Sequence, residues 1–263
     1  LTALFAIALL VYMRISQNHM NARLREEIKE KTRTLQKQHD ALAIANQKLE
    51  EQSYNDPLTN LANRRFGMTF IPKQAEALLQ DYLKQPFDER HVIFVVDIDH
   101  FKSINDNYGH AAGDAVIEHI ASLLRQSFDD SDYIIRWGGE EFLIMMRYGD
   151  AEQATIKAEN VRQAVTSSGC KIDDTHEIHC SCSIGFAMYP FFCDQPSELA
   201  WTQVTEVADK CLYEAKQTGR NRWVGIDSTL LKYDTELVGS LLHRPLCDTV
   251  AAHPTLPLVQ WQV

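Results

Sequence analysis

Residues 91–99 read His-Val-Ile-Phe-Val-Val-Asp-Ile-Asp, and this stretch decides the fold. Val, Ile and Phe dominate the first six residues, which predicts a buried strand. The strand ends at Asp97 and Asp99, so two carboxylates are expected at its exposed tip. We therefore expect a buried sheet strand with carboxylate chemistry at one end.

Helices and short strands alternate along the chain after this strand. Apolar spacing predicts them in the following order: a helix over 111–128, strands over 132–135 and 142–146, a helix over 151–165, a long strand over 176–188, a helix over 198–217 and a strand over 222–226. This order predicts an α/β fold of the α+β sandwich type, with helices on a mostly antiparallel sheet.

The segment Arg136-Trp-Gly-Gly-Glu-Glu141 joins two of the short strands. Paired glycines between apolar runs predict a hairpin, because both glycines can take positive φ. If the hairpin lies beside residues 91–99, Asp97 and Glu140 converge at one edge of the sheet. Paired carboxylates suit Mg²⁺, which usually keeps some of its waters and accepts substrate phosphates.

Composition limits the classes of function. The chain has 263 residues, 45% of them hydrophobic, and a formal net charge of −10. An acidic chain is not expected to grip duplex nucleic acid, whereas a bound metal ion would still admit anionic substrates. Neither GxxxxGK[ST] nor a strand followed by GxGxxG is present, so no P-loop or Rossmann site is indicated.

Six cysteines are scattered along the chain without a CxxC pair, which suggests a reducing compartment. The densest stretch, 176–182, reads His-Glu-Ile-His-Cys-Ser-Cys and resembles a metal site at first sight. In a strand, however, Cys180 and Cys182 would share one face as small buried hydrophobes. We favour this second interpretation, because free cysteines are most often core residues.

Residues 1–13 are apolar and uncharged, but thirteen residues are too few to span a bilayer. Basic residues follow this run, beginning at Arg14, whereas a signal peptide would carry them in front of it. We expect the C-terminal part of a transmembrane helix with its cation-rich side in the cytoplasm. The alternative is a short apolar helix packed on a soluble neighbour.

Residues 14–52 contain neither Pro nor Gly, and Ile28, Leu35, Leu42 and Leu49 recur every seven residues. This pattern predicts a parallel two-stranded coiled coil of marginal stability that acts as a dimerising signalling linker. A solitary charged helix is the alternative, but it would leave the leucine row exposed.

The two remaining parts of the chain contrast in regularity. Residues 53–226 carry the elements described above and are expected to form one globular domain. Residues 227–263 contain three prolines and no clear periodicity. They are expected to be an irregular tail.

Four motifs, in order within residues 53–226, together resemble those of the bacterial GGDEF-domain diguanylate cyclases. They are Asp56-Pro-Leu-Thr-Asn-Leu-Ala-Asn-Arg-Arg65, Asp97-Ile-Asp-His-Phe-Lys-Ser-Ile-Asn-Asp-Asn-Tyr-Gly-His-Ala-Ala-Gly-Asp114, Arg136-Trp-Gly-Gly-Glu-Glu-Phe142 and Ala215-Lys-Gln-Thr-Gly-Arg-Asn-Arg222. The signature is the Gly-Gly-Glu-Glu-Phe variant. Each motif alone is weak, whereas the four together are specific.

The resemblance implies the palm-like fold of nucleotidyl cyclases and polymerases, and condensation of two GTP into cyclic di-GMP and two pyrophosphates. It implies that Asp97, the backbone carbonyl of Ile98, Glu140 and Glu141 hold Mg²⁺, or Mn²⁺ in its place. Glu140 would also act as, or position, the base that takes the 3′-hydroxyl proton. Lys102 would stabilise charge on the phosphates.

The resemblance also implies a set of substrate contacts. These are Asn105 and Asp114 for guanine, His110 for the pocket wall, Gly138 and Gly139 for the ribose and α-phosphate, and Lys216 and Arg220 for the terminal phosphates. Asn105 and Asp114 suit this role chemically, since an amide and a carboxylate together can read a base edge.

Each such domain holds one GTP, so two domains must face each other and a homodimer is expected. A change in the twist or register of the coiled coil could decide whether the half-sites meet, under a sensor that precedes Leu1. The expected location is the bacterial inner membrane, with the catalytic domain in the cytoplasm.

One position departs from the family pattern. Many members carry an Arg-x-x-Asp product-binding site five residues before the glycine pair, but this chain has Asp129-Asp-Ser-Asp132 there. A phosphate of cyclic di-GMP would face a carboxylate instead of a guanidinium. Strong product inhibition through this site is therefore not expected.

Two other functions are alternatives to catalysis. A degenerate member of the fold could serve as a nucleotide receptor or signalling scaffold, and a coiled-coil adaptor could use the globular part only as ballast. Degenerate copies usually lack a metal ligand or a signature glycine, whereas every predicted role is filled here. This favours an active enzyme.

Overall fold

The computed structural model describes residues 13–14, 17, 20–21, 23–42, 54–84, 90–172 and 177–260. The chain divides into two units, residues 1–53 and residues 54–263.

The first unit is helical over residues 23–42, as expected for the linker. Leu24, Ile28, Leu35 and Leu42 are each more than half exposed on it. An exposed leucine row suits a coiled coil, which stays a prediction here. Leu49 and nearly all of the predicted membrane segment lie outside the described residues. Among those that are described, no helix is both long and apolar enough to cross a bilayer.

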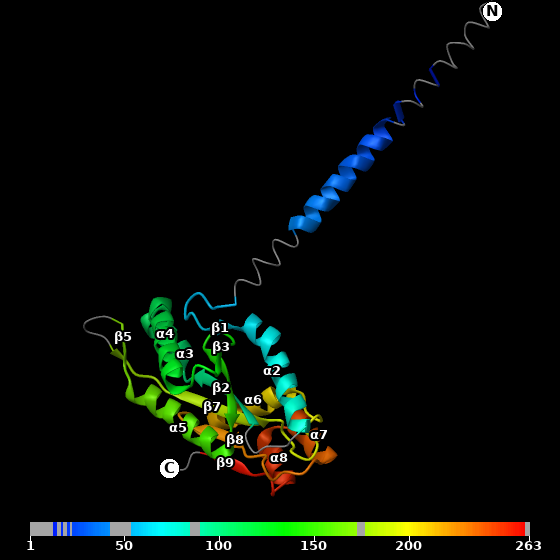
Figure 1. The fold of residues 1–263 in the computed structure, drawn as a ribbon. Coiled ribbons are helices and arrows are strands. Elements are labelled where there is room, and N and C mark those ends of the chain that lie inside the picture. The colour runs from blue at the N-terminus through cyan, green and yellow to red at the C-terminus, as the bar shows by residue number, and fades with distance from the viewer. Residues whose placement is uncertain are drawn as a thin grey trace, which may run out of the picture. The chain divides into compact units, whose positions relative to one another are not determined.

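The second unit is built on a seven-stranded sheet in which β2 is central (Figure 1). In sheet order the strands are β1 (Ala62–Asn63), β3 (Tyr133–Arg136), β4 (Glu141–Gly149), β2 (Arg90–Ile98), β7 (Cys182–Tyr189), β8 (Trp223–Ile226) and β9 (Leu258–Gln260). Only the β1–β3 and β7–β8 pairs are parallel. The expectation of a mostly antiparallel sheet is therefore confirmed.

Helices cover both faces of this sheet (Figure 1). On one face lie α3 (Phe101–Tyr108), α4 (His110–Ser127) and α5 (Ala151–Ser167), and on the other α2 (Arg64–Lys84), α6 (Trp201–Gln217), α7 (Thr235–His243) and α8 (Leu246–Ala252). Phe94 of β2 points into the first core and Val95 into the second. Because both faces are covered, all nine residues of β2 are buried, which explains its unbroken apolar run.

The prediction of one long strand over 176–188 is wrong. A short β6 (Glu177–Ile178) pairs with β5 (Cys170–Lys171) in a separate two-stranded sheet, and β7 begins only at Cys182. The chain leaves the strand at residues 179–181, where the carbonyl of Ser181 accepts a hydrogen bond from the Asp99 amide at 2.9 Å.

The two cysteines next to this break are packed as hydrophobes. Cys182 is fully buried, and Cys180 is half-buried against the first core. Burial raises the pKa of the Cys180 thiol to about 11. Protonated thiols are poor metal ligands, so this supports the hydrophobic interpretation.

The prediction of an irregular tail is wrong for residues 227–260. They form α7, α8 and β9, and β9 pairs with β8 at the edge of the sheet. Four of their leucines are buried in the second core: Leu237, Leu241, Leu246 and Leu256. Lys210 of α6 donates to the carbonyls of Leu241 and Arg244 at the end of α7. These helices have nine and seven residues, too few for a clear periodicity.

Strand β2 begins with two basic residues, Arg90 and His91, at the end opposite to Asp97. Arg90 is 1% exposed and donates to the carbonyl of Pro190 at 3.2 Å and to the hydroxyls of Ser228 and Thr229 at 3.1 and 2.7 Å. It thus ties the start of β2 to the segment that follows β8.

His91, the next residue, is 2% exposed. Burial, with a smaller contribution from the charge of Arg147, lowers the pKa of His91 to about 3. The folded protein therefore keeps this imidazole neutral in mild acid, whereas the unfolded chain protonates it below about pH 6.5.

We predict that His91 makes the domain acid-sensitive. Its contribution to stability is complete above pH 6.5 and falls as the pH drops toward 3. Between pH 8 and pH 5 the wild type should lose about 2 kcal/mol more unfolding free energy than His91→Phe. Denaturant unfolding at both pH values measures this difference. The exposed residue His243, changed to Gln, is the control and should keep the wild-type slope; equal slopes for wild type and His91→Phe would refute the prediction.

Candidate active site

The predicted carboxylates meet at the edge where β2 ends beside the hairpin. Asp97 of β2 is directly opposite Glu141 of β4, and the amide of Ile98 donates to the carbonyl of Glu140 at 3.4 Å. The expected convergence is therefore present. The expected exposed tip is wrong, since Asp97 is only 7% exposed. Strands β4 and β7 flank β2 to its end and remove it from water.

Asp97 is the electrostatic centre of this edge. Burial raises the pKa of its carboxyl, an ion pair with Lys216 opposes this effect, and the charges of Glu140 and Glu141 add to it. The Nζ atom of Lys216 lies 2.8 Å from Oδ1 of Asp97. Asp97 is thus paired with one ammonium group while two further carboxylates act on it, which gives this edge an affinity for further positive charge.

Helix α6 carries Lys216 in its last turn, and its height above the sheet is set by a glycine. A side chain on Gly185 of β7 would collide with the backbone of α6 at Ala208 and Leu212. Because this position has no side chain, the helix backbone packs directly on the strand. The last turn of α6 is thereby placed beside the end of β2.

The two signature glycines leave open space at the turn, but they do not shape it through positive φ. Neither Gly138 nor Gly139 has positive φ in the left-handed range, so the expected conformational reason is wrong. A side chain on Gly139 would meet nothing within 4 Å, and one on Gly138 would come 3.1 Å from the Glu141 carboxylate. The turn is therefore open to a ligand.

Arg136 holds this turn from outside. It donates to both oxygens of Asp56 at 3.0 and 3.1 Å, and twice to the carbonyl of Gly139, at 3.2 and 2.9 Å. Although burial opposes the change, hydrogen bonds from Thr59 and Arg136 lower the pKa of Asp56, so it stays ionised. Asp56 and Arg136 both lie in quoted motifs, but their pairing was not predicted.

The predicted base-reading residues lie on the helix pair α3 and α4. Asn105 packs against Gly113, where any side chain would collide with its amide, and Asp114 follows directly. The structure therefore brings the side chain of Asn105 next to the helical turn of α4 that contains Gly113 and Asp114. Lys102 and His110 are exposed in the first turns of α3 and α4. Within the described chain, no hydrogen bond or ion pair connects either of them to Asp97.

The donor set at the edge fits a hard divalent cation. Among the described residues, no three His, Cys, Asp or Glu side chains are grouped closely enough to bind a metal by themselves. Mg²⁺ does not require such a cage, because it commonly uses one or two carboxylates together with substrate phosphates and waters. Asp97, the carbonyl of Ile98 and Glu140 offer such a partial set, with Glu141 beside it.

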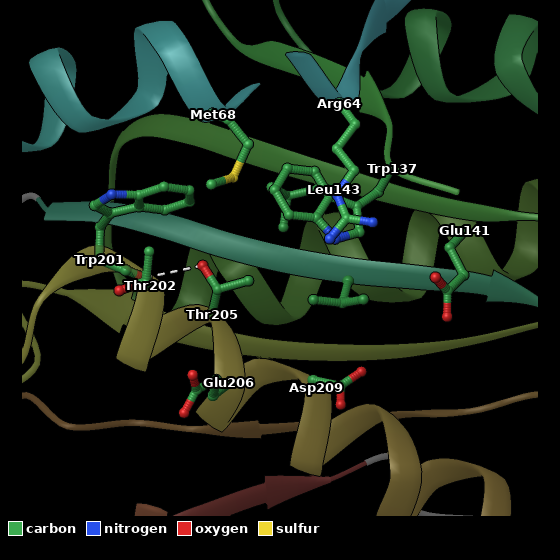
Figure 2. A pocket seen from close by; sticks show the side chains of 11 residues that line it. Arg64, Met68, Trp137, Glu141, Leu143, Trp201, Thr202, Thr205, Glu206 and Asp209 are labelled. Carbon is green, nitrogen blue, oxygen red and sulfur yellow. Dashed lines mark hydrogen bonds between the residues drawn. The ribbon is translucent and has the colours of Figure 1, made fainter. Parts of the chain in front are cut away.

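A cavity of about 520 Å³ adjoins the hairpin on the α2 and α6 side of the sheet (Figure 2). Trp137 and Trp201 both line it, and the guanidinium of Arg64 lies 5.0 Å from the centre of the Trp137 ring. Of the predicted site residues only Glu141 lines this cavity. The cavity therefore borders the carboxylate edge at Glu141 but does not contain Asp97 or Glu140.

Comparison with known proteins agrees with the geometry. The family profile described as "Diguanylate cyclase, GGDEF domain" matches residues 53–222. "Diguanylate cyclase A" of Treponema denticola is 36% identical over 182 residues, which are 69% of this chain and 47% of that protein. "Probable diguanylate cyclase DgcT" of Escherichia coli is 33% identical over 65% of this chain and 35% of its own length. The chain thus spans less than half of these relatives.

Solved structures show the same fold. The coiled coil and GGDEF domain of DgcB from Caulobacter crescentus, in complex with c-di-GMP, has a TM-score of 0.56 and 28% identity, over 77% of this chain and 96% of that one. The GGDEF domain of YfiN from Pseudomonas aeruginosa has a TM-score of 0.54 and 32% identity, over 64% and 91%. This chain belongs to the GGDEF family of diguanylate cyclase domains.

Proposed function

We propose that this chain is an active diguanylate cyclase that condenses two GTP into cyclic di-GMP with the help of Mg²⁺. The observation that carries the proposal is the edge where Asp97, Glu140 and Glu141 meet beside an open glycine turn and the ammonium group of Lys216. Relatives named as diguanylate cyclases support the reaction.

The residues of this edge divide the chemistry among them. Asp97, the carbonyl of Ile98 and Glu140 would hold Mg²⁺ or Mn²⁺, with Glu141 beside them. The cation would supply positive charge to the phosphates and favour ionisation of the 3′-hydroxyl. Glu140 takes that proton or positions the group that does so, since a carboxylate at the substrate is a suitable base.

The remaining predicted residues recognise GTP. Lys102, Lys216 and Arg220 supply positive charge to the phosphate oxygens, which is the main requirement of phosphoryl-type transfer. Asn105 and Asp114 read guanine from the α3–α4 pair, and His110 lines the pocket beside them.

The first test is formation of cyclic di-GMP from GTP and Mg²⁺ by wild type, Glu140→Gln and Glu152→Gln. Loss of the metal-binding carboxylate should lower the rate by about a hundredfold or more. The exposed control Glu152 lies in the first turn of α5, and its variant should keep full activity. GTP binding without any product in wild type would instead indicate a nucleotide receptor or scaffold.

We further propose that two copies must meet for each turnover, because each domain holds one GTP and each 3′-hydroxyl attacks the other α-phosphate. The exposed leucine row on residues 23–42 would pair the two copies. The apolar segment 1–13, followed by Arg14, would attach them to the cytoplasmic face of a bacterial inner membrane. A sensor would control the dimer through the coiled coil.

Dimer dependence has a direct test. Deleting residues 14–52 together with the segment before them should abolish most activity, and a foreign leucine zipper fused before Ser53 should restore it. Specific activity of the unfused domain should fall on dilution, whereas that of the zipper fusion should stay constant. No recovery in a zipper fusion that is shown to be dimeric would count against this proposal.

The departure at Asp129 supports a lack of product inhibition. Its carboxylate lies 3.3 Å from the ammonium of Lys157, and Asp132 accepts the amides of Asp129 and Arg147 at 3.0 and 2.8 Å. The carboxylate of Asp129 is thus paired with Lys157 of α5, and it stands where a guanidinium would bind a phosphate of cyclic di-GMP.

We predict that added cyclic di-GMP causes no tight inhibition of the wild type beyond competition with GTP at the active site. Rate measurements at fixed GTP with increasing cyclic di-GMP test this. Tight inhibition that disappears in Asp132→Asn would contradict it. Weak inhibition that is relieved by more GTP would reflect competition at the active site and leave the prediction intact.

A further inference from the structure

Asp99 lies two residues beyond Asp97 and is only 4% exposed. Its Oδ2 atom accepts the hydroxyl of Ser181 at 2.6 Å and the backbone amide of Asn221 at 2.9 Å, and its Oδ1 atom accepts the hydroxyl of Ser183 at 2.7 Å. All three donors are neutral. A buried carboxylate needs such donors, so they hold Asp99 in one orientation.

Asn221 belongs to the turn that leads from α6 into β8, and the backbone of this turn is unusual. The φ angles are 128° at Gly219, 60° at Arg220 and 47° at Asn221. Left-handed backbone is unfavourable for residues with a side chain and persists only where the surroundings impose it. Two non-glycine residues in succession therefore require external support.

That support comes from three directions. The side chain of Asn221 accepts hydrogen bonds from Arg162 and Thr166 of α5 at 3.0 and 2.9 Å. Within the turn, the amide of Arg220 donates to the carbonyl of Ala215 at 3.0 Å, and its carbonyl accepts a hydrogen bond from Nε of Arg222 at 3.1 Å. From outside the turn, Asp99 accepts the backbone amide of Asn221 and so holds the main chain directly after Arg220.

The same turn follows the helical turn that carries Lys216, whose ammonium pairs with Asp97. We propose that Asp99 is a positioning residue for phosphate recognition. By holding the amide of Asn221 it fixes the left-handed turn and directs Arg220 to the terminal phosphates of GTP. This inference rests on the proposed function, which assigns Arg220 to those phosphates.

Binding of 3′-deoxy-GTP and of GMP, with Mg²⁺, separates this role from general structural support. The first has the terminal phosphates but no 3′-hydroxyl, so it is not consumed; the second lacks the terminal phosphates. Asp99→Ala should lower the affinity for 3′-deoxy-GTP by about tenfold or more, because it removes one charge-assisted hydrogen bond. Binding of GMP should stay within about twofold of wild type.

Two further variants sharpen the test. Asp99→Asn should stay close to wild type, since its carbonyl can accept the amide of Asn221 while its amide donates to a serine hydroxyl. In an Arg220→Ala background, Asp99→Ala should have no additional effect on 3′-deoxy-GTP. Should Asp99→Ala fail to fold, Asp99→Ser carries the same expectations.

Thr249→Val controls for loss of stability, because Thr249 is fully buried and donates to the carbonyls of Ser240 and Pro245, far from the turn in sequence. It should leave the preference for 3′-deoxy-GTP over GMP unchanged. Equal weakening of both nucleotides by Asp99→Ala, or a full effect in the Arg220→Ala background, would overturn the inference.

The outcomes also separate the two proposals. Cyclic di-GMP formation by a wild type that binds 3′-deoxy-GTP no better than GMP would overturn the inference and keep the function. An Asp99-dependent preference for 3′-deoxy-GTP without any cyclic di-GMP would sustain the inference and remove the function.

Discussion

The central constraint on this domain is that a strand buried over its whole length ends in carboxylates. Strand β2 lies between β4 and β7 and under helices on both faces, so Asp97 at its end and Asp99 just beyond it are almost completely buried. Buried ionised groups must find compensation within the protein. Asp97 finds it in the ammonium of Lys216, and Asp99 finds it in three neutral donors. Both solutions recruit the end of α6 and the turn after it.

Local signals allowed the sequence to predict β2, the glycine hairpin and their shared edge, because a buried strand and a Gly-Gly turn are each encoded within a few residues. The resemblance assigned Lys216 to the terminal phosphates, but its ion pair with Asp97 was not predicted, since no local pattern links positions so distant in the sequence. The break after Ile178 was missed for a related reason. The apolar alternation continues through it, and the chain is diverted by Asp99, which is remote in sequence.

The hairpin shows how a correct prediction can rest on a wrong reason. Gly138 and Gly139 were expected to provide positive φ, but the turn closes without it. What the glycines provide is an unobstructed surface, while Arg136 holds the turn through Asp56 and the carbonyl of Gly139. Asp56 and Arg136 are 80 residues apart in the sequence. Only the fold therefore reveals that an ion pair joins the first residues of the second unit to the glycine turn.

Residues at the two ends of β2 also fix the position of a strand, β8, that is not paired with β2. Strand β8 has four residues and pairs with β7 and β9, not with β2. Asp99 holds the turn before β8, through Asn221, and Arg90 holds the residues after it, through Ser228 and Thr229. A short strand is fixed poorly by its own ladder, so these two clamps set its position. Because the tail from residue 227 packs against α6 and pairs with β8, a disturbance of the tail would reach the turn that carries Arg220 by the same route.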